Sequence, residues 1–226
     1  GASVTITEVH LVGQTRDVPT SVFECIGRGT TDEQVLALEV AAHARPPGVL
    51  EWARAKFANA DLPPEVRIRL AVIMAKEGDP SGGEYVLVHA EQGQPKELRK
   101  FAVQSLPLVL GEDAIPRLRD LMRGKAGDVW YSAMQGLQAL GAKAVPALIE
   151  MVGEEGESSD DRGGAASVLG DLGSAARPGV PALIEAAGSA PEYVANSALN
   201  ALVEILPPEE LGPKLIPLLA AGTNDD

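Results

Sequence analysis

The chain has 226 residues, of which 45% are hydrophobic, and a formal net charge of −13 at pH 7. Because phosphate backbones are bound by clustered lysines and arginines, this charge argues against nucleic acid as a partner. The single cysteine, Cys25, excludes an intrachain disulfide framework and a cysteine-rich metal site, and no apolar run approaches the roughly 18 residues that a membrane span requires. Aromatic residues make up only 4% of the chain, which favours closely packed helices.

Residues 1–30 are predicted to form an N-terminal cap. The stretch SVTITEVHLV, residues 3–12, alternates as a strand does, although an isolated strand is only marginally stable. Residues 18–26, VPTSVFECI, match VPALIEMV at 145–152 with one extra residue, so they predict the second helix of a degenerate leading hairpin. The chain begins at Gly1, which leaves open a cytoplasmic location and an extracytoplasmic one reached through a removed signal peptide.

From residue 31 onward the sequence repeats itself. Two copies, AMQGLQALGAKAVPALIEMV from Ala133 and AASVLGDLGSAARPGVPALIEAA from Ala165, share A-x3-L-x2-L-G, a short turn and V-P-A-L-I-E. Similar copies begin at alanines spaced 34, 31, 31, 32 and 33 residues apart, which we name the anchor alanines: Ala37, Ala71, Ala102, Ala133, Ala165 and Ala198. Such regular self-similarity predicts stacked repeats.

Each repeat contains two apolar segments with helical periodicity. In one copy Ala133, Leu137 and Leu140 form one stripe of a helix. Gly141 is predicted to end that helix, and Pro146 to lie in the first turn of the next one, where its missing N–H costs nothing. Each repeat is therefore predicted to be a helical hairpin of about 30 residues, which must stack because it cannot bury its apolar stripe alone.

This pattern resembles the HEAT repeat, in particular the short HEAT-like repeats of phycobilisome lyases, over about residues 31–222. The resemblance implies an all-α fold: a right-handed α-solenoid of about six HEAT-like helical hairpins with an N-terminal half-repeat cap, followed by a tail at 223–226. It also implies that the first helices form the convex side and the second helices line the concave side. Since one fold hosts many functions, the resemblance says little about function.

Two short stretches resemble the motifs around the nucleophile and the histidine of trypsin-type serine proteases: GDPSGG at 78–83 and AAHA at 41–44. In the repeat, the first falls in the turn between two helices and the second in the closing turn of a helix, so turn and cap chemistry is predicted. Pro80 also interrupts the protease motif. We predict no catalytic residues and expect that the chain is not an enzyme.

Metal and DNA sites known from HEAT-like families are not predicted either. The chain has three histidines, which form no local ligand pair: His10, His43 and His89. The deoxyhypusine hydroxylases carry His-Glu dipeptides for di-iron, and no histidine here precedes a glutamate, so no metal or other cofactor is expected. The DNA alkyl-base glycosylases use a basic, aromatic face. Here the basic residues between 96 and 125 alternate with acids, which predicts a solvated helix face, with an anionic partner as the alternative.

The most informative pattern is an acid that follows the apolar pair of the second helices. The residues at this position are Glu24, Glu51, His89, Asp120, Glu150, Glu185 and Pro217. We name five of them the acidic ladder: Glu51, His89, Asp120, Glu150 and Glu185. Stacked repeats would place them about 10 Å apart, too far for a shared metal ion. These residues would attract an extended cationic segment of a partner. The alternative is an ordinary solvated helix face. The acidic loop GEEGESSDD, residues 153–161, is expected to be a hydrated insertion.

The sequence therefore predicts a non-catalytic protein–protein interaction scaffold that binds a basic partner protein or peptide on its concave face. The alternative is a lyase-type or chaperone subunit similar to the phycobilin lyases, which handle a bilin or its apoprotein. A third hypothesis, nucleic-acid repair, predicts salt-sensitive DNA binding and is opposed by the net charge.

Overall fold

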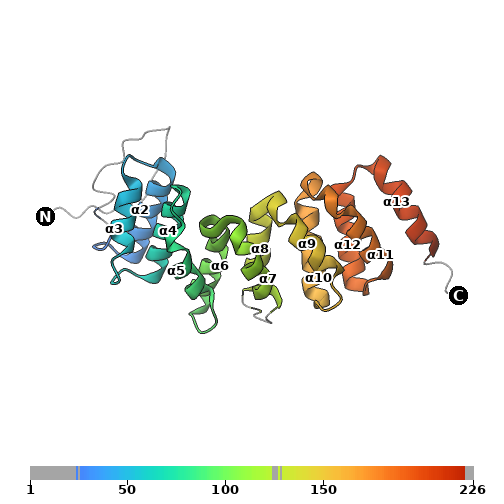
Figure 1. Ribbon diagram of the computed structural model, residues 1–226, viewed down its shortest axis with the longest axis horizontal. Helices are drawn as coiled ribbons and strands as arrows, with labels where there is room; N and C mark the ends of the chain where they lie inside the picture. The colour runs from blue at the N-terminus through green and yellow to red at the C-terminus, as the bar shows by residue number, and fades with distance from the viewer. Residues whose placement is uncertain (1–23, 25, 124–126, 128, 222–226) are drawn as a thin grey trace. The chain divides into compact units, whose positions relative to one another are not determined.

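The computed structural model describes residues 24, 26–123, 127 and 129–221 (Figure 1). Every regular element in this part of the chain is a helix, which confirms the all-α prediction there. None of these helices is long and apolar enough to cross a membrane. The predicted strand at 3–12 and the tail at 223–226 lie outside the described residues, as does most of the predicted helix at 18–26. Ile26, at its end, is buried in a hydrophobic core with Leu38 and Leu70.

The chain divides into two compact units, unit 1 (Gly1–Leu110) and unit 2 (Gly111–Asp226). Unit 1 contains α2 (Thr31–Ala44), α3 (Val49–Phe57), α4 (Pro64–Lys76), the short 3-10 helix η1 (Pro80–Gly82), α5 (Gly83–Ala90) and α6 (Lys96–Leu110). Unit 2 contains η2 (Gly111–Ala114), α7 (Ile115–Arg123), α8 (Trp130–Leu140), η3 (Gly141–Ala144), α9 (Val145–Gly153), α10 (Ser159–Asp171), η4 (Gly173–Gly179), α11 (Val180–Ser189), α12 (Glu192–Ile205) and α13 (Pro208–Ala221).

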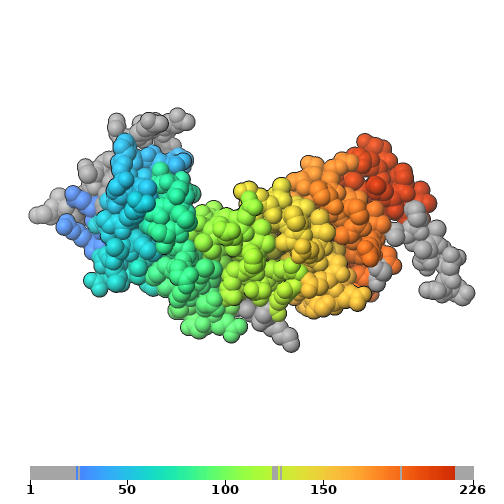
Figure 2. Space-filling model, viewed as in Figure 1, coloured from blue at the N-terminus to red at the C-terminus, as the bar shows by residue number. Residues whose placement is uncertain are grey.

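Within each unit, helices contact their neighbours from adjacent pairs. In unit 1, α4 lies against α2 and α6, while α3 contacts α4 and α5 contacts α6. In unit 2, α10 lies against α8 and α12, α9 contacts α10 and α11, and α11 contacts α12. Segments of successive colour accordingly adjoin one another inside each unit (Figure 2). The first helices of successive pairs therefore pack against one another, an arrangement compatible with an α-solenoid.

The anchor alanines occupy equivalent buried positions in the structure. Each of the six lies in the first helix of its pair, and each has an exposed fraction of 0%. A small side chain at these positions lets neighbouring backbones approach closely. At Gly82, for example, an added Cβ would lie 2.4 Å from the Cβ of Ala71. The recurring alanine is therefore a packing position.

Polar contacts join residues that are about one repeat apart. In unit 1, Arg45 Nε lies 2.6 Å from Glu77 Oε1, 32 residues along the chain. In unit 2, Gln138 Nε2 donates to Asp171 Oδ2 at 3.2 Å, across 33 residues. These separations match the sequence period of 31–34 residues, because stacking brings equivalent positions of successive pairs side by side.

The turns between paired helices have the predicted cap chemistry. Gly141 ends α8 with a left-handed φ of 61°, which glycine adopts without steric cost. In the GDPSGG stretch, Asp79 accepts hydrogen bonds from the Ser81 amide at 3.0 Å and from Arg54 Nε at 2.5 Å, and Pro80 opens η1. These bonds lower the pKa of the Asp79 carboxyl to about 2, with the Arg54 bond as the main cause. The stretch is a capped turn that ties α3 to the next helix pair.

Candidate functional site

Three members of the acidic ladder lie on second helices of unit 2. Asp120 on α7, Glu150 on α9 and Glu185 on α11 are all exposed. The Glu150 side chain, 67% exposed, forms an ion pair with Arg119 of α7 at 2.9 Å. This ion pair and the contact between α9 and α11 make the three helices consecutive neighbours. The three acids therefore recur on adjacent helices, and Glu150 forms an ion pair with Arg119.

The other two members of the ladder lie in unit 1 and differ from each other. Glu51 is exposed in the first turn of α3. His89 on α5 is half-buried, and its Nδ1 donates a hydrogen bond to the carbonyl of Tyr85 at 2.8 Å. The two rings also stack with a centroid separation of 4.2 Å. His89 thus has a local packing role on its own helix, which the sequence pattern did not indicate.

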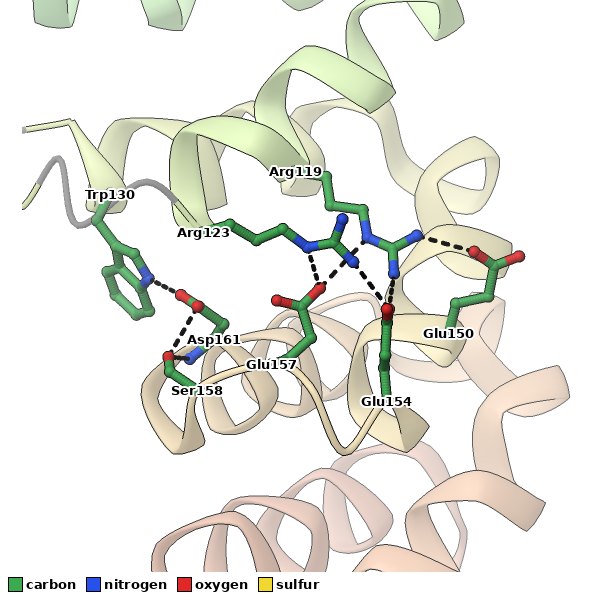
Figure 3. A network of polar contacts seen from close by, with 8 residues as sticks. All are labelled: Arg119, Arg123, Trp130, Glu150, Glu154, Glu157, Ser158 and Asp161. Atoms are coloured by element: carbon green, nitrogen blue, oxygen red, sulfur yellow. Dashed lines mark hydrogen bonds and ion pairs between the residues drawn. The ribbon is translucent and has the colours of Figure 1, made fainter.

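Two arginines of α7 hold the end of α9 and the loop that follows it (Figure 3). Arg119 contacts Glu150 and Glu154, and its Nε lies 3.5 Å from Glu157 Oε1. Arg123 donates from Nη2 to Glu154 Oε2 at 2.8 Å and also pairs with Glu157 through Nε. The loop at 153–161 was expected to be a hydrated insertion. Its ion pairs show that it is anchored.

Burial makes this network more than a surface feature. The side chain of Glu157 is 3% exposed and that of Arg119 is 17% exposed. Charges withdrawn from water to this extent need close partners, because desolvation costs more than a surface ion pair returns. The hydrogen bond to Glu157 accordingly raises the pKa of Arg123 above its usual value. The network fixes the loop against α7 while retaining one excess negative charge, since three glutamates surround two arginines.

The start of α10 is tied to the start of α8. Trp130 Nε1 donates to Asp161 Oδ1 at 2.7 Å, and Ser158 Oγ donates to Asp161 Oδ2 at 2.7 Å. Ser158 is also the N-cap of α10, because its hydroxyl accepts from the Asp161 amide at 3.1 Å. The indole N–H of Trp130 is therefore held by Asp161, which is itself hydrogen-bonded to Ser158, the N-cap residue of α10.

Two successive glycines in α10 allow aromatic rings to lie against its backbone. A Cβ on Gly163 would lie 2.4 Å from Cε1 of Tyr193, and a Cβ on Gly164 would lie 2.7 Å from Cζ2 of Trp130. Tyr193, in the first turn of α12, is nevertheless 52% exposed. α10 thus packs against Trp130 of α8 and Tyr193 of α12, and Tyr193 remains accessible to solvent.

These groups line a pocket of about 940 Å³ in unit 2, within the size range of ligand pockets. We name it the aromatic–acidic pocket after its main lining residues: Trp130, Tyr193, Glu154, Glu157, Asp160 and Asp161. Arg123 also lines it. The sequence pattern predicted no pocket at these residues. The available signal was the separation of 31 residues between Trp130 and Asp161, which equals the repeat period.

The lining of the pocket suits a cationic group. In the part of the chain that the structure describes, no group of three or more His, Cys, Asp and Glu side chains could hold a metal ion. The pocket offers aromatic faces and carboxylates, which suit a cation. No protein-family model matches the chain, and no curated protein matches its sequence. The site is therefore interpreted from its own geometry.

Proposed function

We propose that the chain is a right-handed α-solenoid of HEAT-like helical hairpins and acts as a non-catalytic scaffold that binds a basic segment of a partner protein. The observation that carries this proposal is the recurrence of exposed carboxylates on three successive second helices of unit 2. These residues are Asp120, Glu150 and Glu185. Repetition at equivalent positions provides regularly spaced charges, which is what an extended chain can match.

The spacing specifies the partner further. Packed helices lie about 8–10 Å apart, and a peptide in the polyproline II conformation advances about 3.1 Å per residue with three residues per turn, so that every third side chain points the same way. A lysine or arginine at every third residue would therefore meet successive acids of unit 2. The excess of negative charge in this unit, 18 acidic against 8 basic residues, would also steer a basic segment toward it.

A fluorescence anisotropy titration tests the proposal. The probe is a labelled twelve-residue peptide with lysine at every third position and glycine and serine between, and the reference peptide has the same composition with its four lysines adjacent. We expect the spaced peptide to bind more tightly. The triple variant Asp120→Lys, Glu150→Lys and Glu185→Lys should weaken its binding by roughly tenfold or more at low salt.

The matched control changes the same net charge elsewhere in unit 2. Glu192→Lys, Glu204→Lys and Glu209→Lys replace three exposed acids of α12 and α13. The control variant should bind the spaced peptide more tightly than the ladder variant does. Equal losses in both variants, or equal binding of the two peptides, would show only a general attraction between opposite net charges and would contradict the ladder as the binding surface.

A further inference from the structure

We propose that the aromatic–acidic pocket takes the guanidinium group of one arginine side chain of the partner protein. This inference rests on the proposed scaffold function and identifies an anchor for it. The pocket lies wholly in unit 2 and is lined by residues of α7, α8, α10 and α12 and of the loop before α10. None of the ladder residues Asp120, Glu150 and Glu185 lines it, although α7 contributes to both.

The charges of the pocket select a cation. Arg119 and Arg123 are already matched by the three glutamates of the network. Asp161 adds a carboxylate, held by Trp130 and Ser158, and Asp160 adds another that is exposed in the first turn of α10. These two acids also offset the positive end of the helix. An anion entering the pocket would meet this excess of carboxylates, whereas a cation would be stabilised by it.

The rings of the pocket are held in place before a ligand arrives. Trp130 is fixed by the hydrogen bond from Nε1 to Asp161, and Tyr193 lies on the bare backbone at Gly163. Aromatic faces attract cations, and a guanidinium also stacks on them through its planar surface. Because the rings need little reordering, less of the interaction energy is lost on binding. The exposed Tyr193 is the ring most accessible to an incoming side chain.

Arginine fits this lining better than lysine because its planar guanidinium can stack on an aromatic ring, as two arginines of unit 1 do. In unit 1 the Arg67 guanidinium carbon lies 4.1 Å from the ring centroid of Tyr85, and that of Arg69 lies 4.2 Å from the centroid of Phe101. A guanidinium can stack in this way and still donate N–H bonds from its edge to a carboxylate such as Asp160. A lysine ammonium is more strongly hydrated and has no planar face.

Trp130 provides a direct readout. The chain contains two tryptophans, so Trp52→Phe leaves Trp130 as the only indole. The probe is the capped tripeptide acetyl-Gly-Arg-Gly-amide, titrated at constant ionic strength while the Trp130 fluorescence is recorded. For a single anchored side chain we expect saturation with a dissociation constant of about 1 mM. The lysine tripeptide should bind roughly threefold more weakly, and the citrulline tripeptide, which is neutral but similar in shape, should not saturate in the same range.

Variants of the pocket complete the test. Tyr193→Ala and Asp160→Asn should each weaken the arginine tripeptide by roughly threefold to tenfold, while Tyr193→Phe, which keeps the ring, should bind as the parent does. The matched control is Tyr131→Ala, because Tyr131 is 64% exposed on the same helix as Trp130 and is outside the pocket lining. This control should leave the dissociation constant unchanged.

The result that overturns the proposal is equal binding of the citrulline and arginine tripeptides, or an unchanged dissociation constant in Tyr193→Ala. The scaffold function fails separately. If the spaced lysine peptide binds through the ladder and the arginine tripeptide does not bind, the pocket proposal is wrong and the scaffold proposal stands. If the tripeptide binds as expected and the spaced peptide does not, the pocket is confirmed and the ladder is wrong.

Discussion

The two units stack helix pairs in similar ways but use their arginines differently. In unit 1, Arg45 and Arg54 pair with carboxylates at the next helix pair, whereas Arg67 lies over the rings of Phe57 and Tyr85. In unit 2, Arg119 and Arg123 contact carboxylates of the following pair. The two units also differ in charge: unit 1 has 14 acidic and 11 basic residues, and unit 2 has 18 acidic and 8 basic residues. Unit 2 therefore has a net charge of −10 against −3 for unit 1, so a cationic partner is attracted more strongly to unit 2.

The largest expected effects concern the feature that the units share, their apolar packing. Leu70→Ala in unit 1 and Leu148→Ala in unit 2 each remove a side chain that is 0% exposed. Each should lower the free energy of unfolding by roughly 2–5 kcal/mol, because the loss of burial and the remaining cavity add together. Urea denaturation measures the loss. Hydrogen exchange should show increased opening mainly in the unit that carries the substitution.

The control for both is Leu108→Ala, which shortens a leucine that is 53% exposed on α6. It should change stability by no more than about 0.5 kcal/mol. If either core variant increased exchange equally throughout both units, the chain would unfold as one cooperative body, and the separate description of the two units would be wrong in energetic terms.

The second prediction tests where the units differ. Glu157→Gln removes the charge of a side chain that is 3% exposed and faces two arginines, so it should lower the free energy of unfolding by about 1–3 kcal/mol. Arg67→Met in unit 1 removes a guanidinium from two rings and should cost about 0.5–2 kcal/mol. Urea denaturation of both variants at several salt concentrations makes the comparison.

Salt separates the buried and exposed parts of the unit 2 network. Glu150 is 67% exposed, so Glu150→Gln should lower the free energy of unfolding only slightly at low ionic strength, and this loss should vanish in roughly 0.5 M sodium chloride. The effect of Glu157→Gln should persist, since buried pairs are screened much less. A Glu157→Gln effect that disappeared with salt would contradict the burial of this carboxylate.

Much of the fold could be predicted from the sequence because it depends on local periodicity. The anchor alanines, the stop at Gly141 and the helix start at Pro146 follow from helix geometry and from repetition, and the structure places each of them as predicted. A repeat carries this information several times, so an error in one copy is corrected by the others.

The pocket could not be predicted in the same way because it depends on departures from the repeat. Tyr193 lies on α10 only because Gly163 lacks a side chain, and Glu157 belongs to a loop that interrupts the repeat pattern. Asp160 was noted only as part of that acidic loop. Periodicity identifies equivalent positions, whereas these contacts need knowledge of which side chains meet in space. The pairs Trp130–Asp161 and Arg119–Glu150 are each separated by 31 residues, but many other residue pairs have this separation, so the sequence alone did not identify them as contacts.

The next prediction concerns pH and the capped turn of unit 1. The pKa of Asp79 is lowered from 3.8 to about 2 in the folded protein, so its carboxylate stabilises the fold above pH 4, and this contribution is lost as the pH falls from 4 to 2. Asp79→Asn should be less stable than the parent at pH 5, and the difference should shrink toward pH 2. Urea denaturation at pH 5, 4, 3 and 2 measures it. Parallel curves for the two proteins would contradict the role of the Arg54 bond.

The smallest expected effect concerns an exposed ion pair of unit 2. Lys143 Nζ lies 3.0 Å from Glu112 Oε1, across one repeat, but the two side chains are 61% and 60% exposed. Water and ions screen such a pair, and ordering two long side chains offsets its attraction, so Lys143→Ala should change the free energy of unfolding by less than about 0.5 kcal/mol. A loss as large as that of Glu157→Gln in urea denaturation would show that the repeat spacing of an ion pair, rather than its burial, determines its contribution. We expect burial to decide, because the side chain of Glu112 is 60% exposed whereas that of Glu157, which contacts two arginines, is 3% exposed.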